Sequence, residues 1–461
     1  MSDREIRSVC VVGDGIVGLS AAAAFARALP GVVVAIVPAE PDSASVAEIQ
    51  CATWPYIHRF HAAIGLTEPA LVRDGIATPL LGAQFVEWPH GSSAWIHGFG
   101  EHGLKAGDIP FHMLWQRAFR TGNAAPYWRH GAAAVLGAEG RFVPPSRDPA
   151  SPLGGFLYAL RLDPPRYRTE LAACTVALRR HARFAGVEYR EDGGIAAVAT
   201  ADGERVTADL FIDASGAQAL LQSPGVEDFE PWSDWLPGRT MRLRERPVES
   251  GTPLDQATTH ECGWRWSSPL ADRTVTIEIS DTDDGAPLRF GRRTPWVGNR
   301  LAIGDAATAI DPLFGTALHL AHDAILLAID LLPGRDFAAV ELAEYNRRTQ
   351  ATAERMRDLH ALHHQHNQAA TASLPAGLAR TIEQFTRRGR LPPSEAEPFE
   401  TDAWLAALIG LGFAPEGDDP LAGSVDAGRA ADAMAALAGR FADAADAALP
   451  YPQWLARIRA G

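Results

Sequence analysis

The chain has 461 residues, more than one hydrophobic core usually organises, so we expect roughly two or three interleaved domains. Hydrophobic residues make up 47% and charged residues 21%, the balance of an ordinary globular protein. The net charge is −14, and no run rich in Lys and Arg is present that would neutralise phosphates. Nucleic acid is therefore excluded as an expected partner.

The cysteine pattern favours a reducing compartment. The four cysteines lie far apart, and none forms a C-x-x-C pair that would bind a metal or cycle between thiol and disulfide: Cys10, Cys51, Cys174 and Cys262. The first residues enter a strand without the pattern of a secretory leader. No apolar run approaches the ~20 residues that a membrane-spanning helix needs. We expect a cytoplasmic protein with no membrane partner.

The N-terminal elements predict a β-turn-α-β unit, with a buried strand over 7–13, a helix of small residues over 15–29 and a second strand over 31–37. A helix near 55–65 and an alternating strand over 82–88 follow. The stretch 89–155 is rich in Gly, Pro, His and Trp, which indicates loops over a site.

The later elements alternate between strands and helices. Residues 164–191 predict a helix running into a strand, and 195–216 contain a hairpin with Asp-Gly at its turn and a last strand ending at Asp213. Alternating segments over 237–290 indicate an antiparallel sheet. Helices are expected over 320–333, 337–368 and 426–448, and a loop over 389–398.

The turn after the first strand carries a G-x-G-x-x-G motif, Gly13-Asp14-Gly15-Ile16-Val17-Gly18. Its glycines permit a tight turn and close approach of a pyrophosphate to the positive end of the next helix. An acid near the end of the second strand should hold the ribose, but Pro38 stands at the expected place. Glu40 or Asp42 takes that role by a small shift, or is ordinary surface charge.

Two further segments select flavin over nicotinamide. Residues 208–216, which include Asp213, and 298–307, which include Gly304 and Asp305, resemble the later motifs of FAD-dependent hydroxylases and halogenases. In this resemblance Asp305 accepts hydrogen bonds from the ribityl hydroxyls. The helix that follows Pro312 would point its N-terminus, Gly315, Thr316 and Ala317, at the flavin pyrimidine edge. The expected cofactor is FAD.

Ordered matches along nearly the whole chain resemble the tryptophan-halogenase family of flavin-dependent enzymes. Residues 51–66 resemble its E-A-T-x-P segment, with Cys51 in place of Glu, and residues 80–88 its K-x-G-x-x-F-x-x-W strand. Residues 263–270 match W-x-W-x-I-P-L, with Ser268 where Ile is usual. Residues 403–421 and 449–461 match its C-terminal segments.

The resemblance implies an α/β fold. A Rossmann-like FAD-binding domain of the flavin hydroxylase/halogenase type would take residues 1–75, 156–225 and 291–335. Residues 76–155 and 226–290 would form an antiparallel substrate-side sheet with loops, and 336–461 a helical C-terminal region.

The resemblance also implies a mechanism. A separate flavin reductase supplies FADH2, which reacts with O2 to a flavin C4a-hydroperoxide. Halide attacks this to give hypohalous acid, and a Lys then delivers the halogen to an aromatic carbon with help from a Glu.

The chain departs from the family at both of these positions, since the Lys aligns with Leu80 and the Glu with Phe314. The next Ser, part of the halide site, becomes Gly315, and Thr316 remains. Trp264 and Trp266 match the wall that separates flavin from substrate, or are core aromatics. Gly304-Asp305 is typical of hydroxylases.

The substrate side offers several candidates. His97 and Phe99 align with residues that sandwich an indole, or belong to a structural loop. His112, near Trp115, is a candidate acid or base, or a satisfied buried histidine. His360, His363 and His364 share a helix face, which raises the hypothesis of a metal site. No acidic or Cys partner has suitable spacing, so we expect no bound metal.

We therefore predict an FAD-dependent monooxygenase that acts on an aromatic or indole-like small molecule, free or carrier-bound, in biosynthesis. The alternatives are an unusual halogenase, an FAD oxidase or dehydrogenase, and a flavin-binding pseudoenzyme that serves as a partner protein. No hydroxylase-type NADPH motif is found, so a separate flavin reductase is the expected electron source.

Overall fold

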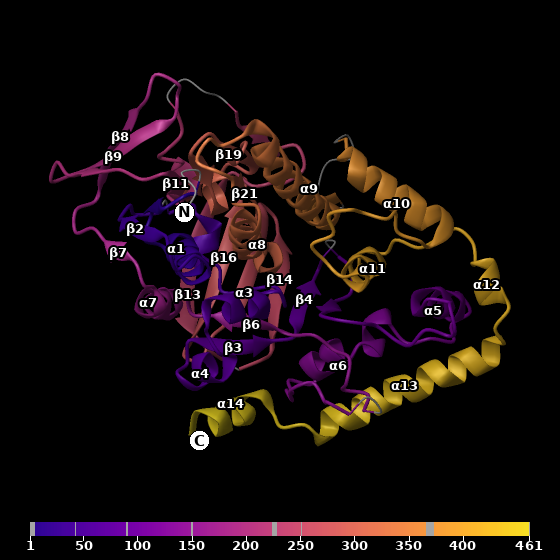
Figure 1. Cartoon of the computed structure of the whole chain (residues 1–461). Coiled ribbons are helices and arrows are strands. Elements are labelled where there is room, and N and C mark those ends of the chain that lie inside the picture. Colours follow the sequence, from indigo (N-terminus) through magenta and orange to yellow (C-terminus); the bar gives the residue numbers. More distant parts are fainter. Residues whose placement is uncertain are drawn as a thin grey trace. The chain divides into compact units, whose positions relative to one another are not determined.

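The computed structural model describes residues 5–41, 43–88, 91–148, 151–223, 228–249, 251–365 and 373–460 (Figure 1). The chain forms two compact units. The first contains residues 1–71, 162–242 and 282–354, and the second contains 72–161, 243–281 and 355–461. The region 336–461, predicted as one helical part, is thus divided between the units at residues 354 and 355.

The first unit is built on a six-stranded sheet with the order β19-β20-β11-β1-β2-β7. All neighbours are parallel except β19 and β20, as expected for a Rossmann-like fold. The strands of this unit are β1 (Ser8–Val12), β2 (Val33–Val37), β7 (Leu178–Arg179), β8 (Phe184–Tyr189), β9 (Ile195–Thr200), β10 (Arg205–Val206), β11 (Leu210–Asp213), β12 (Glu230–Pro231), β17 (Ala286–Pro287), β18 (Gly291–Arg292), β19 (Trp296–Val297), β20 (Arg300–Ala302) and β21 (Thr308–Ala309).

Helix α1 covers this sheet and packs against α3, α7 and α8. The helices of the unit are α1 (Ile16–Ala28), α2 (Val46–Ile49), α3 (Ile57–Ile64), α7 (Pro164–Cys174) and α8 (Thr316–Asp330), with short 3-10 helices at Gly216–Gln218, Gly304–Ala306 and Leu313–Gly315. Helices α4 (Glu68–Arg73) and α9 (Ala339–His364) continue from this unit into the second.

The carboxyl ends of the central strands coincide. Val12 of β1 is in register with Val37 of β2 and with Asp213 of β11, and Asp213 is in register with Ala302 of β20. Ligands of open parallel sheets bind at this edge. The turns that carry the G-x-G-x-x-G motif, Asp213 and Asp305 therefore meet at one edge.

The second unit contains an antiparallel group of strands with the order β16-β15-β14-β4-β5, in which only the β14–β4 pair is parallel. β13 enters this unit from the first and lies next to β16 in the sheet order. The strands are β3 (Ala77–Leu80), β4 (Gly82–Val86), β5 (Trp95–Gly98), β6 (Ala159–Leu162), β13 (Thr240–Pro247), β14 (Leu254–His260), β15 (Gly263–Pro269) and β16 (Arg273–Ser280).

The expectation of loops over 89–155 is wrong for much of that stretch. It contains β5, α5 (Phe111–Arg120), a 3-10 helix at Tyr127–His130 and α6 (Ala132–Ala138). Short helices are marginal alone and depend on tertiary packing. Here Phe111 and Trp115 of α5 pack with Tyr127 and with Met434 of α13 (Ala427–Ala447). The remaining helices are α10 (Ala376–Arg388), α11 (Thr401–Gly410), α12 (Pro420–Gly423) and α14 (Tyr451–Ala460).

One segment corrects the expectation about apolar runs. Leu313–Asp330, which includes α8, is long and apolar enough to cross a membrane by length and composition. However, 67% of it is buried inside the protein. Its composition is therefore explained by its place as a core helix of the first unit.

Candidate active site

The glycine-rich turn has the geometry that the motif predicts. Gly13 has φ +120°, and a Cβ atom there would lie 2.3 Å from the Ala214 carbonyl oxygen. A Cβ atom at Gly18 would lie 2.1 Å from the Gly13 carbonyl oxygen, so α1 starts in direct contact with the turn. The first N–H groups of a helix have no partner within the helix and form an anion site.

A carboxylate of the chain already occupies this anion site. The backbone N–H of Ile16 donates to Glu48 Oε2 at 2.5 Å, and that of Val17 donates to Glu48 Oε1 at 3.0 Å. Burial raises the pKa of Glu48, while the two amides and Arg168 oppose that rise. Glu48 comes from α2, more than thirty residues away, so the motif alone gave no indication of this contact.

Asp305 is buried with an incomplete set of partners. Its Oδ2 accepts a hydrogen bond from the Ala47 backbone N–H at 3.3 Å. Its Oδ1 has no hydrogen-bond partner among the residues that the structure describes. Burial, followed by repulsion from Glu48, raises the pKa of Asp305 to about 7. A buried oxygen without a partner is costly, which indicates a group shaped for a ligand.

Asp213 differs from Asp305, because both of its oxygens have partners. Oδ1 accepts hydrogen bonds from the Ser215 backbone N–H at 3.2 Å and the Ser215 hydroxyl at 2.5 Å. Oδ2 accepts one from the Leu221 backbone N–H at 2.8 Å. Asp213, which was predicted to bind the cofactor, therefore stabilises the turn after β11 through these hydrogen bonds.

The segment before α8 holds a strained residue. Phe314 has φ 58° and ψ 4°, a left-handed conformation that costs a bulky side chain ~1–3 kcal/mol. Its ring is buried and meets the Trp54 ring edge-on, with centroids 5.7 Å apart. Gly315 follows with φ +73°, and a Cβ atom there would lie 2.1 Å from the Ala52 carbonyl oxygen. Thr316 donates from Oγ1 to the Leu313 carbonyl oxygen at 3.3 Å, and Ala317 continues the helix.

One short segment, residues 46–52, joins the start of α1, Asp305 and the segment before α8. Ala47 bonds to Asp305, Glu48 to the start of α1, and the Gln50 side-chain amide donates to the Pro312 carbonyl oxygen. The carbonyl of Ala52 lies against Gly315. Sequence reasoning missed this role, because a four-residue helix carries no periodicity that would mark it.

FAD fits these residues. The glycine turn carries backbone amides that bind an anion, and Asp305 lines a cavity of about 180 Å³ together with Val46, Phe229, Arg289 and Arg293. Of the two acids predicted for the ribose, the structure describes only Glu40. Glu40 is exposed and pairs with Arg183 at 2.8 Å, and Asp42 lies outside the described residues.

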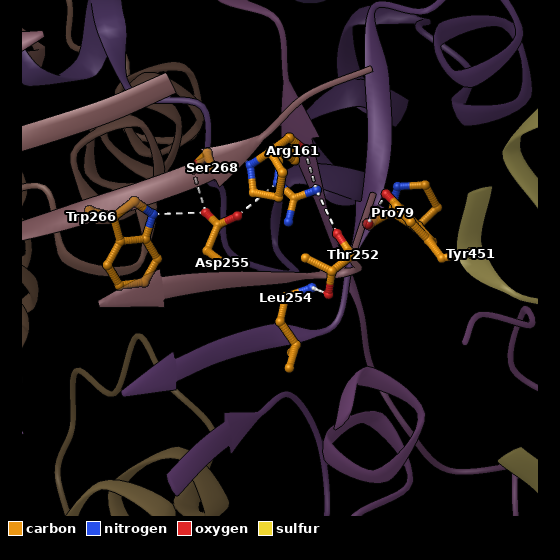
Figure 2. A network of polar contacts seen from close by, with 9 residues as sticks. Pro79, Arg161, Thr252, Leu254, Asp255, Trp266, Ser268 and Tyr451 are labelled. Carbon is orange, nitrogen blue, oxygen red and sulfur yellow. Dashed lines mark hydrogen bonds and ion pairs between the residues drawn. The ribbon is translucent and has the colours of Figure 1, made fainter. Parts of the chain in front are cut away.

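In the second unit, Trp264 and Trp266 alternate onto the buried face of β15. The Trp266 Nε1–H donates to Asp255 Oδ2 at 2.7 Å, and the Ser268 hydroxyl donates to the same oxygen at 2.6 Å (Figure 2). Ser268, which departs from the family motif, thus bonds to the same carboxylate oxygen as Trp266.

Arg161 completes this network. Its Nε donates to Asp255 Oδ1 at 2.7 Å, and its Nη1 donates to the carbonyl oxygens of Thr252 and Pro269 at 3.1 and 2.8 Å (Figure 2). Arg161 and Asp255 are both 0% exposed. This fully buried pair holds one edge of the Trp266 indole in place.

A stack of rings lies beside these tryptophans. Phe85 stacks on Trp95 with centroids 4.4 Å apart and on His363 with centroids 5.1 Å apart. Trp88 meets Trp264 edge-on with centroids 5.7 Å apart. The Trp264 Nε1–H is buried and has no hydrogen-bond partner among the described residues. The sequence places Phe85 and Trp88 in a family motif, but only the fold joins them to Trp95 and His363.

Leu80, His97 and Phe99 are buried in the same unit. Leu80 ends β3, and His97 lies on β5 opposite Ala83 of β4. Burial holds the pKa of His97 well below 6.5, so this imidazole is neutral. The Phe99 backbone N–H donates to the Leu81 carbonyl oxygen at 3.0 Å, which brings Phe99 next to the Leu80 segment.

His112 and Trp115 hold α5 in place. The His112 Nε2–H donates to the Gly389 carbonyl oxygen at 2.6 Å, and burial lowers the pKa of His112. The Trp115 Nε1–H donates to the Ala125 carbonyl oxygen at 2.8 Å. Their assignment to substrate stays a prediction.

The histidines of α9 are used in packing. The His363 Nδ1–H donates to the Leu359 carbonyl oxygen at 2.8 Å, and the His364 ring lies 5.6 Å from both the Trp88 and the Trp264 rings. His360 is buried on the same helix. Within the described part of the chain, no group of three His, Cys, Asp or Glu is arranged to hold a metal ion.

Comparisons with known proteins agree on one family over most of the chain. A profile of the family described as tryptophan halogenase matches residues 8–427. Tryptophan 7-halogenase KtzQ of Kutzneria sp. is 24% identical, over 90% of this chain and 91% of its own. Tryptophan 7-halogenase RebH of Lentzea aerocolonigenes is 26% identical, over 78% and 76%. The structure of BrvH, a flavin-dependent halogenase from Brevundimonas sp. BAL3, is 31% identical with a TM-score of 0.91, covering 99% of this chain and 100% of that one. The predicted fold class is confirmed.

Proposed function

Because the chain belongs to the tryptophan halogenase family of FAD-dependent enzymes, we propose that it uses reduced FAD and O2 to oxygenate an aromatic or indole-like small molecule and does not act as a standard halogenase. FAD as cofactor and oxidoreductase chemistry follow from the family itself. The type of reaction and the substrate are proposed from the residues of this chain.

The observation that carries the proposal is the chemistry of Leu80 and Phe314. The family pattern places a Lys and a Glu at these positions, and here both side chains are apolar and buried, each with 1% exposure. Neither group can hold an oxidised halogen or accept the proton that an aromatic carbon loses on substitution. Reduced flavin and O2 still supply an oxidant, which can transfer oxygen to a substrate held close to it.

The aromatic substrate is supported by the second unit. Phe85, Trp95 and the tryptophans of β15 form a buried cluster of rings, and an aromatic environment of this kind favours a flat, electron-rich molecule beside it. The partnerless N–H of Trp264 is a hydrogen-bond donor that an acceptor on such a molecule satisfies. A free small molecule and one attached to a carrier are both consistent with this face.

An unusual halogenase is the second candidate, and retained residues favour it. Trp264, Trp266 and Thr316 match the family pattern. If they separate flavin from substrate, direct oxygen transfer is blocked and a diffusible oxidised halide becomes necessary. Product mass, measured with chloride, with bromide and without halide, separates the two candidates.

We place the protein in the cytoplasm with a separate flavin reductase as its electron source. The four cysteines form no disulfide in the described structure, and Cys10 and Cys51 are buried, which suits a reducing compartment.

The test restores the missing groups. We expect the double variant Leu80→Lys with Phe314→Glu to transfer halogen to an aromatic probe such as indole, measured by product mass in the presence of reductase, FAD, O2 and bromide. Leu80→Met with Phe314→Gln is the matched control, because it changes the same side chains without adding charge. A folded, FAD-binding double variant that halogenates no better than this control would contradict the alignment at these positions.

Oxygen reactivity of the native protein completes the test. We expect its reduced FAD complex, mixed with oxygenated buffer, to form a long-lived oxygenated flavin whose lifetime chloride does not change. Immediate return to oxidised flavin would favour an oxidase or a pseudoenzyme instead.

A further inference from the structure

Glu48 occupies the N-terminus of α1, the positive helix end at which the FAD diphosphate would bind. Its two carboxylate oxygens each accept a hydrogen bond from successive amides at the start of α1, Ile16 and Val17. The helix has no side-chain cap of its own, since Gly15 precedes it. A carboxylate in this position mimics one phosphate of a dinucleotide.

Glu48 occupies the space directly in front of the glycine-rich turn. A Cβ atom at Gly15 would lie 2.4 Å from Glu48 Oε2, and the carboxylate already accepts hydrogen bonds from the amides of Ile16 and Val17. A diphosphate that binds these amides therefore has to displace the Glu48 side chain. Only the side chain needs to rotate, because α2 remains anchored through the bond between Ala47 and Asp305.

We propose that Glu48 is a built-in competitor of the FAD diphosphate, so that cofactor binding requires its displacement and is weaker and more readily reversed than the glycine-rich turn alone would make it. This inference needs only that the chain binds FAD, which its family establishes, and is independent of whether the reaction is oxygenation or halogenation.

The charges around Glu48 give the exchange a dependence on pH. Asp14 and Asp305 repel its carboxylate, and Arg168, which also pairs with Asp14 at 3.3 Å, attracts it. On α8, burial keeps the pKa values of His319 and His322 low, so both rings stay neutral. Protonated Glu48 has no charge, so it binds the amides more weakly and no longer repels a diphosphate. FAD affinity should therefore rise as pH falls through the raised pKa of Glu48.

The experiment measures equilibrium binding of oxidised FAD by fluorescence quenching and by calorimetry. We expect Glu48→Ala to bind FAD at least tenfold more tightly than the native chain, and Glu48→Gln, which keeps the shape without the charge, to do so by a smaller factor. ADP, which carries the diphosphate without the flavin, should show the same ratios. Riboflavin, which has no phosphate, should show none. Glu139→Gln, at an exposed position of the second unit, is the control variant.

The pH profile separates Glu48 from Asp305, which titrates in all variants. We expect the rise in affinity at low pH to be shallower in Glu48→Gln than in the native chain. Equal or weaker FAD and ADP binding in both variants would overturn the proposal and make Glu48 a support for the cofactor. If Glu48→Ala fails to fold, Glu48→Gln still decides through its ADP affinity and its pH profile.

Discussion

Asp305 in the first unit and Asp255 in the second are both buried carboxylates, but their surroundings differ. Asp255 has partners on both oxygens, from Arg161, Trp266 and Ser268. Asp305 is bonded by backbone amides, Ala47 to Oδ2 among them, and its Oδ1 has no hydrogen-bond partner among the described residues. No arginine or lysine bonds to it within the described residues.

The difference separates a carboxylate that organises the protein from one that awaits a ligand. A satisfied buried network contributes to a unique packing arrangement, and here it orients Trp266. A partly satisfied carboxylate costs folding free energy in the absence of its ligand. Glu48 can be compared with Asp305 on the same grounds. Its carboxylate supplies the anion that the amides at the start of α1 bind.

The largest expected effect comes from breaking the satisfied network. Asp255→Asn leaves the buried Arg161 charge without its counter-ion, so the free energy of unfolding should fall by about 3–5 kcal/mol. Urea denaturation measures this. The double variant Arg161→Met with Asp255→Asn should lose less than the sum of the two single changes, because it strands no charge. Simple additivity would mean that the pair is not coupled.

Replacing Asp305 with a residue that cannot ionise should raise the free energy of unfolding, whereas Asp255→Asn lowers it. Burial raises the pKa of Asp305 from 3.8 to about 7, so its contribution to stability is present below pH 3.8 and is lost as pH rises through 7. Asp305→Asn should therefore stabilise the cofactor-free protein above pH 7, by at most ~4 kcal/mol, and by less near pH 4.

Asp213→Asn is the matched control for this change, because both oxygens of Asp213 accept hydrogen bonds and the amide of Asn can accept on one side only. It should destabilise the protein at both pH values. Asp305→Asn should also weaken FAD binding, and a variant that loses stability above pH 7 would show that the Asp305 carboxylate is structural.

The smallest expected effect distinguishes two neighbouring tryptophans. Trp266→Phe removes a hydrogen bond to a carboxylate, whereas Trp264→Phe removes an N–H that has no partner in the described structure. Both changes remove the same volume, so Trp266→Phe should cost ~1.5–3 kcal/mol more in thermal or urea unfolding. Equal losses would show that the bond between Trp266 and Asp255 contributes little.

Much of the first unit could be predicted from the sequence because its elements are specified locally. The β-branched run over 7–13, the glycines that follow and the Asp-Gly turn near residue 202 each determine their own backbone. Asp305 could be found in the same way, since it lies next to a recognisable turn. In the second unit the alternating strands were predictable, whereas α5 and α6 were not, because their stability comes from contacts made far along the chain.

The sequence by itself determined the family, the cofactor and the main strands and helices of the first unit, since these follow from motifs and periodicities within short windows. Tertiary structure decided which groups are satisfied. Glu48 reaches the start of α1 across 32 residues, and Arg161 reaches Asp255 across 94. The left-handed backbone of Phe314 is likewise held in place by its surroundings. Hydrogen bonding and burial depend on residues that are distant in sequence and meet only in the folded chain, so no local sequence pattern predicts them.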